Sequence, residues 1–239
     1  MSTHSIPHAA TRPEADRTAR VSPHWAWLLR GLAVGFVVPY VLTDLLDLNR
    51  DLFYGLYALA VAALVAAWAR STGYDLAAAV RRRWPVALAL GVLCAGLLTI
   101  MVVRAEDATT RPDGIQFAAA VLWRGVLYGA TDGLLLSAFP ILVVFAAFAG
   151  SRLRQRLAGT LVVGAVALLA SLAMTAVYHA GYSDFRSTKV ARPIAGDVVW
   201  SIPTLLTLNP IGAPIAHAGM HVSAVLHSYE TETFLPPHK

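Results

Sequence analysis

The segment from Trp84 to Val103 reads WPVALALGVLCAGLLTIMVV, a run of apolar or small residues without a charged side chain. About 20 such residues in a helix are long enough to cross the hydrocarbon core of a bilayer. The whole chain has the same character, because its 239 residues are 57% hydrophobic and 14% charged, whereas soluble domains carry about 25% charged residues. The sequence therefore predicts an all-α, polytopic membrane protein with about six to eight transmembrane or half-membrane helices.

Further apolar stretches lie on both sides of this segment. The expected crossings are 25–43, 52–69, 84–103, 115–149 and 157–178. The stretch 115–149 is too short for two crossings, which need about 40 residues, so we expect one crossing with an interfacial or broken portion. Two shorter segments, 198–208 and 211–227, end the apolar region. We expect a final pair of helices there, the first of them a re-entrant or half-membrane helix.

The loops between these segments alternate in charge. Residues 70–83 and 151–156 are rich in arginine, as is the N-terminal tail, whereas 44–51, 104–114 and 181–197 are acidic or mixed. Because arginine-rich loops stay in the cytoplasm, we expect a multi-pass protein of the cell (plasma) membrane with a cytoplasmic N-terminus.

The pattern predicts three parts of the chain. Residues 1–23 form a disordered cytoplasmic tail, residues 24–228 a single helical membrane domain, and residues 229–239 a polar C-terminal tail. The lipid bilayer is the expected partner, and the net charge of +5 reflects membrane orientation and not nucleic-acid binding. Cys94 is the only cysteine, which excludes internal disulfides and a cysteine-based metal cluster.

The last apolar segment carries the candidate metal ligands. His217 and His221 are four residues apart, so a helix places both on one face. Imidazoles in a bilayer are costly and indicate a function. His179, at the end of the preceding long apolar stretch, is the expected third ligand, because catalytic zinc usually keeps three protein ligands. We therefore expect zinc or another divalent metal, with His227 left out because it points about 120° away from His221.

Charged residues supply candidates for catalysis. Asp132 or Asp184 would orient or deprotonate water, and Arg124 would stabilise an anionic intermediate. Arg124 and Asp132 are eight residues apart, roughly on one face of an α-helix, and are also consistent with a structural ion pair through a partner. Asp184 and Asp197 fall in the polar loop, where solvation alone would explain them. A face for close helix packing is expected at Gly125, Gly129 and Gly133.

The C-terminal half, residues 115–227, resembles a known family in three places. Leu122-Trp-Arg-Gly-Val-Leu-Tyr128 resembles the end of an EExxxR motif, His179 resembles the histidine of FxxxH, and Ala213-Pro-Ile-Ala-His-Ala-Gly-Met-His221 resembles HxxxN. These are the motifs of the CPBP family, the CAAX and bacteriocin-processing (Abi) intramembrane proteases. The resemblance implies that histidines hold a metal or an oxyanion and that paired glutamates activate water.

The chain departs from that family at the glutamates. They fall on Ala119 and Ala120, and the Asn of the last motif falls on His221. The resemblance therefore supports a shared fold better than a shared activity.

Three functions remain open from the sequence. The first is a divergent intramembrane metal-dependent protease or hydrolase, with peptides or other membrane proteins as substrates. The second is a non-catalytic membrane scaffold, immunity factor or partner subunit in which His217 and His221 are hydrogen-bonding residues between helices. The third is a small-solute or proton-coupled transporter, because Pro203 and Asn209-Pro210 interrupt the apolar pattern as in a discontinuous helix.

Overall fold

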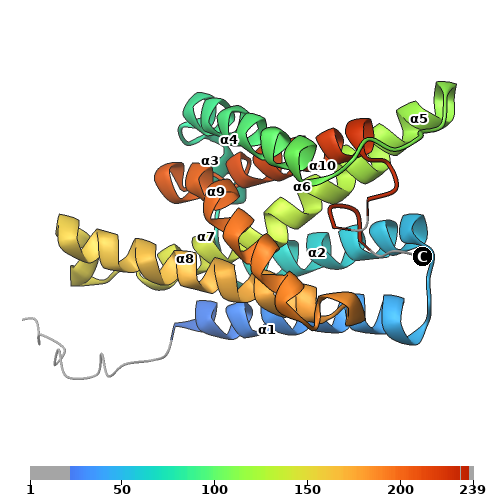
Figure 1. Cartoon of the computed structure of the whole chain (residues 1–239). Helices are drawn as coiled ribbons and strands as arrows, with labels where there is room; N and C mark the ends of the chain where they lie inside the picture. The colour runs from blue at the N-terminus through green and yellow to red at the C-terminus, as the bar shows by residue number, and fades with distance from the viewer. Residues whose placement is uncertain (1–21, 232, 237–239) are drawn as a thin grey trace, which may run out of the picture.

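The computed structural model describes residues 22–231 and 233–236, and within them the protein is all-helical without a β-strand. This confirms the predicted all-α class; the predicted N-terminal tail lies, up to residue 21, outside the described residues. The α-helices are α1 (Pro23–Pro39), α2 (Arg50–Thr72), α3 (Leu76–Arg81), α4 (Trp84–Ala105), α5 (Gly114–Ala120), α6 (Tyr128–Asp132), α7 (Phe139–Ala147), α8 (Leu157–Ala180), α9 (Ala191–Thr207) and α10 (Gly212–His227). Figure 1 shows their arrangement.

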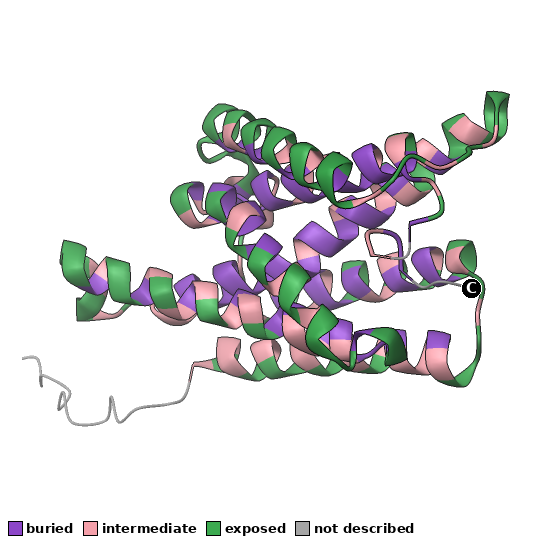
Figure 2. Ribbon diagram, in the orientation of Figure 1, coloured by how far each residue is buried: buried purple, intermediate pink, exposed green. Residues whose placement is uncertain are grey.

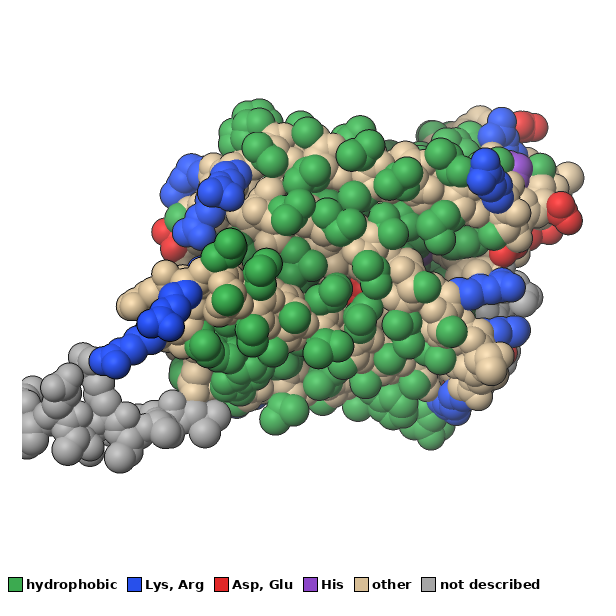
Figure 3. Space-filling view, turned by 60° about the vertical axis from the view of Figure 1, so that its left-hand side comes forward, with side chains coloured by type: hydrophobic (Ala, Val, Ile, Leu, Met, Phe, Trp, Pro, Cys, Tyr) green, Lys and Arg blue, Asp and Glu red, His purple; other side chains and the backbone are tan. Residues whose placement is uncertain are grey.

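Five helical segments are long and apolar enough to cross a membrane. They are Pro23–Leu45, Arg50–Thr72, Trp84–Ala105, Gly114–Ala147 and Leu157–Ala180, and each contains most of one of the predicted crossings. Large apolar side chains, such as Leu29, Leu59 and Leu169, are exposed on these helices. Figure 3 shows hydrophobic side chains over the middle of one face and most of its charged side chains at the two ends. Such a broad apolar surface indicates a protein surrounded by lipid.

The segment Gly114–Ala147 is the central helix of the bundle. It comprises α5, α6 and α7 joined by π-helical turns at Val121–Leu127 and Gly133–Ala138. The most apolar window of this segment is 78% buried, against 22–39% in the other four segments, and Figure 2 shows α6 and α7 largely buried. Pro140 is the second residue of α7 and directly follows the π-helical turn Gly133–Ala138. The predicted irregularity of this stretch takes the form of π-turns within one continuous helix.

The glycine ladder packs against α10. A side chain added at Gly125 would meet Val222, one at Gly129 would meet Ala218, and one at Gly133 would meet Pro214. The ladder therefore forms the predicted close-packing face. From Gly125 to Gly133 the residues met on α10 run backwards, from Val222 to Pro214, so α10 runs antiparallel to the central helix. On its other side α10 packs along α4, and Figure 1 shows these two helices side by side.

Helix α9 begins seven residues earlier than the expected segment 198–208. The predicted polar loop 181–197 is therefore wrong at its end, because residues 191–197 form the first two turns of α9. Asp197 is fully buried and not solvated, since hydroxyl groups of α9 itself, of α8 and of the central helix surround it. The helix ends at Leu208 in a left-handed conformation. Asn209 then donates hydrogen bonds to the carbonyls of Val80 and Arg82, which fixes this turn to the end of α3 and the residue after it.

The segment after α10 returns to the bundle. The side chains of Thr231 and Leu235 are buried, and Leu235 packs with Cys94, Trp200 and other residues of α4, α9 and α10. The predicted polar tail is therefore packed against the bundle where the structure describes it, because it contains an apolar pair at Phe234 and Leu235.

Candidate metal centre

The carboxylate of Asp132 and the imidazoles of His217 and His221 meet inside the bundle. Each offers one ligand atom, and these atoms all lie within 4.8 Å of one another. Asp132 Oδ2 is 3.8 Å from Nε2 of His217 and 3.6 Å from Nε2 of His221. Ligand atoms about 2.0–2.1 Å from a tetrahedral zinc lie roughly 3.3–3.4 Å apart. The spacing therefore fits a shared metal ion with small shifts of the side chains.

The glycine ladder explains how the three residues meet. Gly129 and Gly133 bring the backbones of α6 and α10 into contact, and Asp132 ends α6 immediately before Gly133. One turn of α10 separates the two histidines, whose rings are stacked with centroids 4.9 Å apart and planes 5° apart. Larger residues on the ladder would keep the carboxylate away from the histidines.

Four polar atoms of this cluster are buried and have no hydrogen-bond partner in the described structure. Asp132, His217 and His221 are each 2% exposed. Asp132 Oδ1, His217 Nδ1 and both ring nitrogens of His221 make no hydrogen bond within the described structure. Buried polar groups without partners are destabilising and rare in native proteins. A cation bound between Asp132 Oδ2 and the two Nε2 atoms would give the unpartnered Nε2 of His221 a ligand bond.

Aromatic side chains fix the orientation of the ligands. The ring of Trp200 packs on His217 with centroids 4.3 Å apart, and Tyr128 packs edge-on against His221 at 4.8 Å. The phenol of Tyr57 interacts electrostatically with the Asp132 carboxylate. Such surrounding groups orient metal ligands and are needed for high affinity.

His179 lies beside the cluster but is not one of its three members. Its Nδ1 lies 2.8 Å from the backbone carbonyl of Thr175. A carbonyl only accepts, so Nδ1 carries the proton, and in the neutral imidazole Nε2 is then a free acceptor. His179 was predicted as a ligand together with His217 and His221, and the structure instead brings Asp132 against that pair. From the sequence, Thr175 could be expected beside His179 only because the two residues are four positions apart, one turn of a helix.

A small cavity of about 40 Å³ adjoins the cluster. A cavity of this size has room for a water molecule. It is lined by Asp132 and the three histidines, by Arg192 and Trp200 of α9, and by Thr233, Phe234 and Pro236 of the C-terminal segment. Neither Arg192 nor Trp200 belongs to a sequence motif, so only the fold reveals that they line this cavity. For a metal ion held by the cluster, the cavity would leave an open coordination position, with Arg192 nearby.

Arg124 and Asp184 do not belong to this cluster. Arg124 instead donates to both carboxylate oxygens of Asp51, at 2.8 and 2.7 Å. Arg124 therefore pairs with an aspartate of α2, whereas Asp132, eight residues further along the central helix, lies against the histidines of α10. Asp184 lies exposed in a short 3₁₀ turn, Ser183–Phe185.

No protein-family model matches the chain, and neither a curated protein nor a solved structure matches it. The likeness to CPBP proteases therefore rests on the motifs at residues 122–128, 179 and 213–221 alone.

Proposed function

We propose that this protein is an integral membrane, metal-dependent hydrolase whose metal is held by Asp132, His217 and His221. The observation that carries the proposal is the approach of three buried ligand atoms to within 4.8 Å of one another, with ring nitrogens that lack protein partners. Ionisable residues inside a membrane domain are functional by default, because they are costly there.

The ligand set favours zinc. Two imidazoles and one carboxylate are a usual ligand set of catalytic zinc sites, which keep three protein ligands and one open position. Calcium and magnesium prefer oxygen ligands throughout. Iron held by two histidines and one carboxylate is the nearest competitor, so the metal content distinguishes the two.

The remaining groups of the cavity supply the other parts of a hydrolytic site. A bound zinc ion lowers the pKa of water and polarises a carbonyl group of the substrate. His179 accepts the proton of the attacking water at Nε2, while the Thr175 carbonyl holds Nδ1–H in place. Arg192 and the indole N–H of Trp200, which has no partner in the described structure, stabilise negative charge that develops on the substrate. This assignment gives no role to Arg124 or Asp184.

The proposed membrane arrangement has seven helices that cross or enter the bilayer, the five long segments together with α9 and α10. Helices α9 and α10 have 17 and 16 residues, near the lower limit for a full crossing. The antiparallel packing of α10 on the central helix supports alternating directions. The arginine-rich loops support a cytoplasmic N-terminus in the plasma membrane.

A substrate panel tests the proposed activity. Full-length protein in liposomes would be loaded with zinc and supplied with membrane-embedded peptides and with lipid esters and amides. We expect hydrolysis of one class that stops on chelation and in the Asp132→Asn variant. His227→Ala is the matched control, because His227 lies on α10 but bonds the Glu106 carbonyl instead. Zinc-loaded protein that hydrolyses none of these classes would favour the non-catalytic scaffold.

A second function, transport of protons or small cations, is favoured by the surroundings of Asp197. Its carboxylate accepts hydrogen bonds from Ser137, Ser171, Ser201 and Thr175, at 2.7–3.0 Å, in the interior of the bundle. A buried carboxylate on a helix with an internal proline is typical of ion pathways. Proton or sodium flux into liposomes that is abolished by Asp197→Asn would support transport, and the absence of flux would exclude it.

A further inference from the structure

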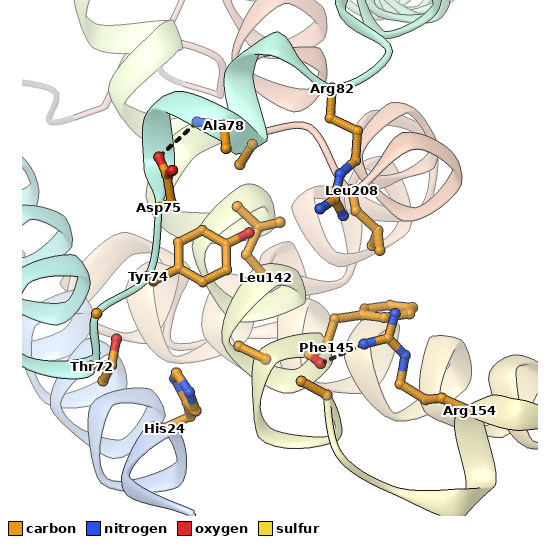
Figure 4. A pocket seen from close by; sticks show the side chains of 14 residues that line it. His24, Thr72, Tyr74, Asp75, Ala78, Arg82, Leu142, Phe145, Arg154 and Leu208 are labelled. Carbon is orange, nitrogen blue, oxygen red and sulfur yellow. Dashed lines mark hydrogen bonds between the residues drawn. The ribbon is translucent and has the colours of Figure 1, made fainter.

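A pocket of about 320 Å³ lies at the arginine-rich end of the bundle, far from the Asp132 cluster in the fold. Its walls come from the first turn of α1, the turn between α2 and α3, the end of α7 and the loop after it. Figure 4 shows Tyr74, Arg82 and Arg154 around this pocket, with Leu142 and Leu208 between them. The pocket therefore combines cationic and apolar walls.

Two guanidinium groups line the pocket without an acidic partner among the described residues. Arg82 interacts with Tyr74, and Arg154 donates to the Phe145 carbonyl at 3.2 Å and lies over the Phe145 ring. The arrangement at the other end of the bundle is different, since Arg124 and Arg186 there are paired with aspartates. The positive charge at this pocket is thus available to an external anion.

Neutral donors add to the two arginines. The Trp68 indole donates to Nδ1 of His24 at 3.1 Å, so the neutral His24 ring carries its proton on Nε2 and is a donor. Burial raises the pKa of Tyr74, opposed in part by the charge of Arg82, so its hydroxyl keeps its proton. The single acid in the pocket wall, Asp75, accepts the backbone N–H of Ala78 at 2.8 Å and caps α3. The donors outnumber the acceptors, which is the requirement for binding a phosphate.

The position of the pocket identifies the source of the phosphate. It lies where the apolar helices α2 and α7 end, and Leu142, Ala146 and Leu208 form part of its wall. Further arginines lie near the pocket, at positions 81, 83, 152 and 156, and Figure 3 shows such basic side chains at the end of the hydrophobic face. A basic pocket between helices at this level suits a lipid headgroup, with the glycerol and upper acyl chain against the apolar wall.

We propose that this pocket binds the phosphate headgroup of an anionic phospholipid, with Arg82 and Arg154 as its cationic ligands and Tyr74 as a hydroxyl donor.

Native mass spectrometry of the purified full-length protein tests the proposal. It compares the binding of phosphatidylglycerol with that of phosphatidylcholine. We expect preferential binding of phosphatidylglycerol and its loss in the double variant Arg82→Gln/Arg154→Gln. The matched control is Arg81→Gln/Arg152→Gln, which removes the same charge from exposed residues outside the pocket. The pocket variant should lose at least about ten-fold more affinity than the control, because charge-assisted hydrogen bonds are lost in addition to surface charge.

Further variants keep the test decisive. Arg82→Gln alone and Tyr74→Phe remove no hydrogen bond to the rest of the described protein, so both should fold while binding phosphatidylglycerol more weakly. Equal losses in the pocket and control variants would show general surface attraction and overturn the proposal. Stabilisation by millimolar inorganic phosphate equal to that by phosphatidylglycerol would identify a soluble anion as the ligand and overturn the lipid assignment.

Discussion

Replacing Gly129 with alanine tests whether the glycine ladder holds Asp132 against the two histidines. A Cβ atom at this position would lie 2.7 Å from Cα of Ala218 and 3.0 Å from Cδ2 of His221. Carbon atoms normally approach to about 3.5–4.0 Å. The atom at Ala218 belongs to the backbone and has no alternative rotamer, so α10 must move outward by roughly 1 Å.

This displacement has two measurable consequences. Overpacking of a close helix contact lowers the free energy of unfolding by about 1–3 kcal/mol. A metal site tolerates displacement of its ligands by only about 0.5 Å, so Gly129→Ala should also weaken zinc binding by at least about ten-fold. Thermal unfolding in detergent measures the first effect, and titration of the metal-free protein with zinc measures the second.

Gly96→Ala is the matched control. Gly96 lies within α4, and a Cβ atom added there has no neighbour within 4 Å. This substitution should leave zinc binding unchanged and raise stability by about 0.5–1 kcal/mol, as expected for alanine in a helix interior. If the Gly129→Ala variant has the same free energy of unfolding and the same zinc affinity as the unaltered protein, close packing of α6 and α10 does not position the site.

Three further substitutions separate the metal centre from its surroundings. Arg124→Gln breaks a partly exposed pair with Asp51 and should lower the free energy of unfolding by at most about 1 kcal/mol, with no change in zinc content; loss of metal would place Arg124 in the centre. Ser171→Ala removes a hydroxyl that donates to Asp197 and should lower the free energy of unfolding by about 1–3 kcal/mol. Thermal unfolding measures this change, and unchanged stability would show that the carboxylate does not need this donor. His179→Ala should retain zinc and abolish hydrolysis if His179 accepts the proton; loss of zinc would make it a fourth ligand.

Local composition was sufficient to predict the long helices and the histidine pair. Each of the five long segments owes its position to a predominantly apolar run, and the four-residue spacing of His217 and His221 requires only a helix. The spacing of Gly125, Gly129 and Gly133 predicted a packing face correctly, but nothing in it identified α10 as the partner.

The rest depends on contacts between distant residues. Asp132 and His217 are 85 positions apart in the sequence, and only the packing of α6 on α10 brings them together. The π-turns could not be predicted from composition, and neither could the pairing of Arg124 with Asp51 of α2. Asp197 looked solvated because polar residues precede it, whereas its hydroxyl partners come from the central helix and α8 as well as from α9.

The zinc content of the purified full-length protein tests the central claim most directly. Mass spectrometry of the metals should find about one zinc per chain in the unaltered protein and in His227→Ala, and much less in Asp132→Asn, His217→Ala and His221→Ala. X-ray absorption should show nitrogen and oxygen neighbours at about 2.0–2.2 Å. Protein that remains free of zinc, iron and other transition metals after incubation with them, and whose stability is unchanged by His217→Ala, would contradict the account.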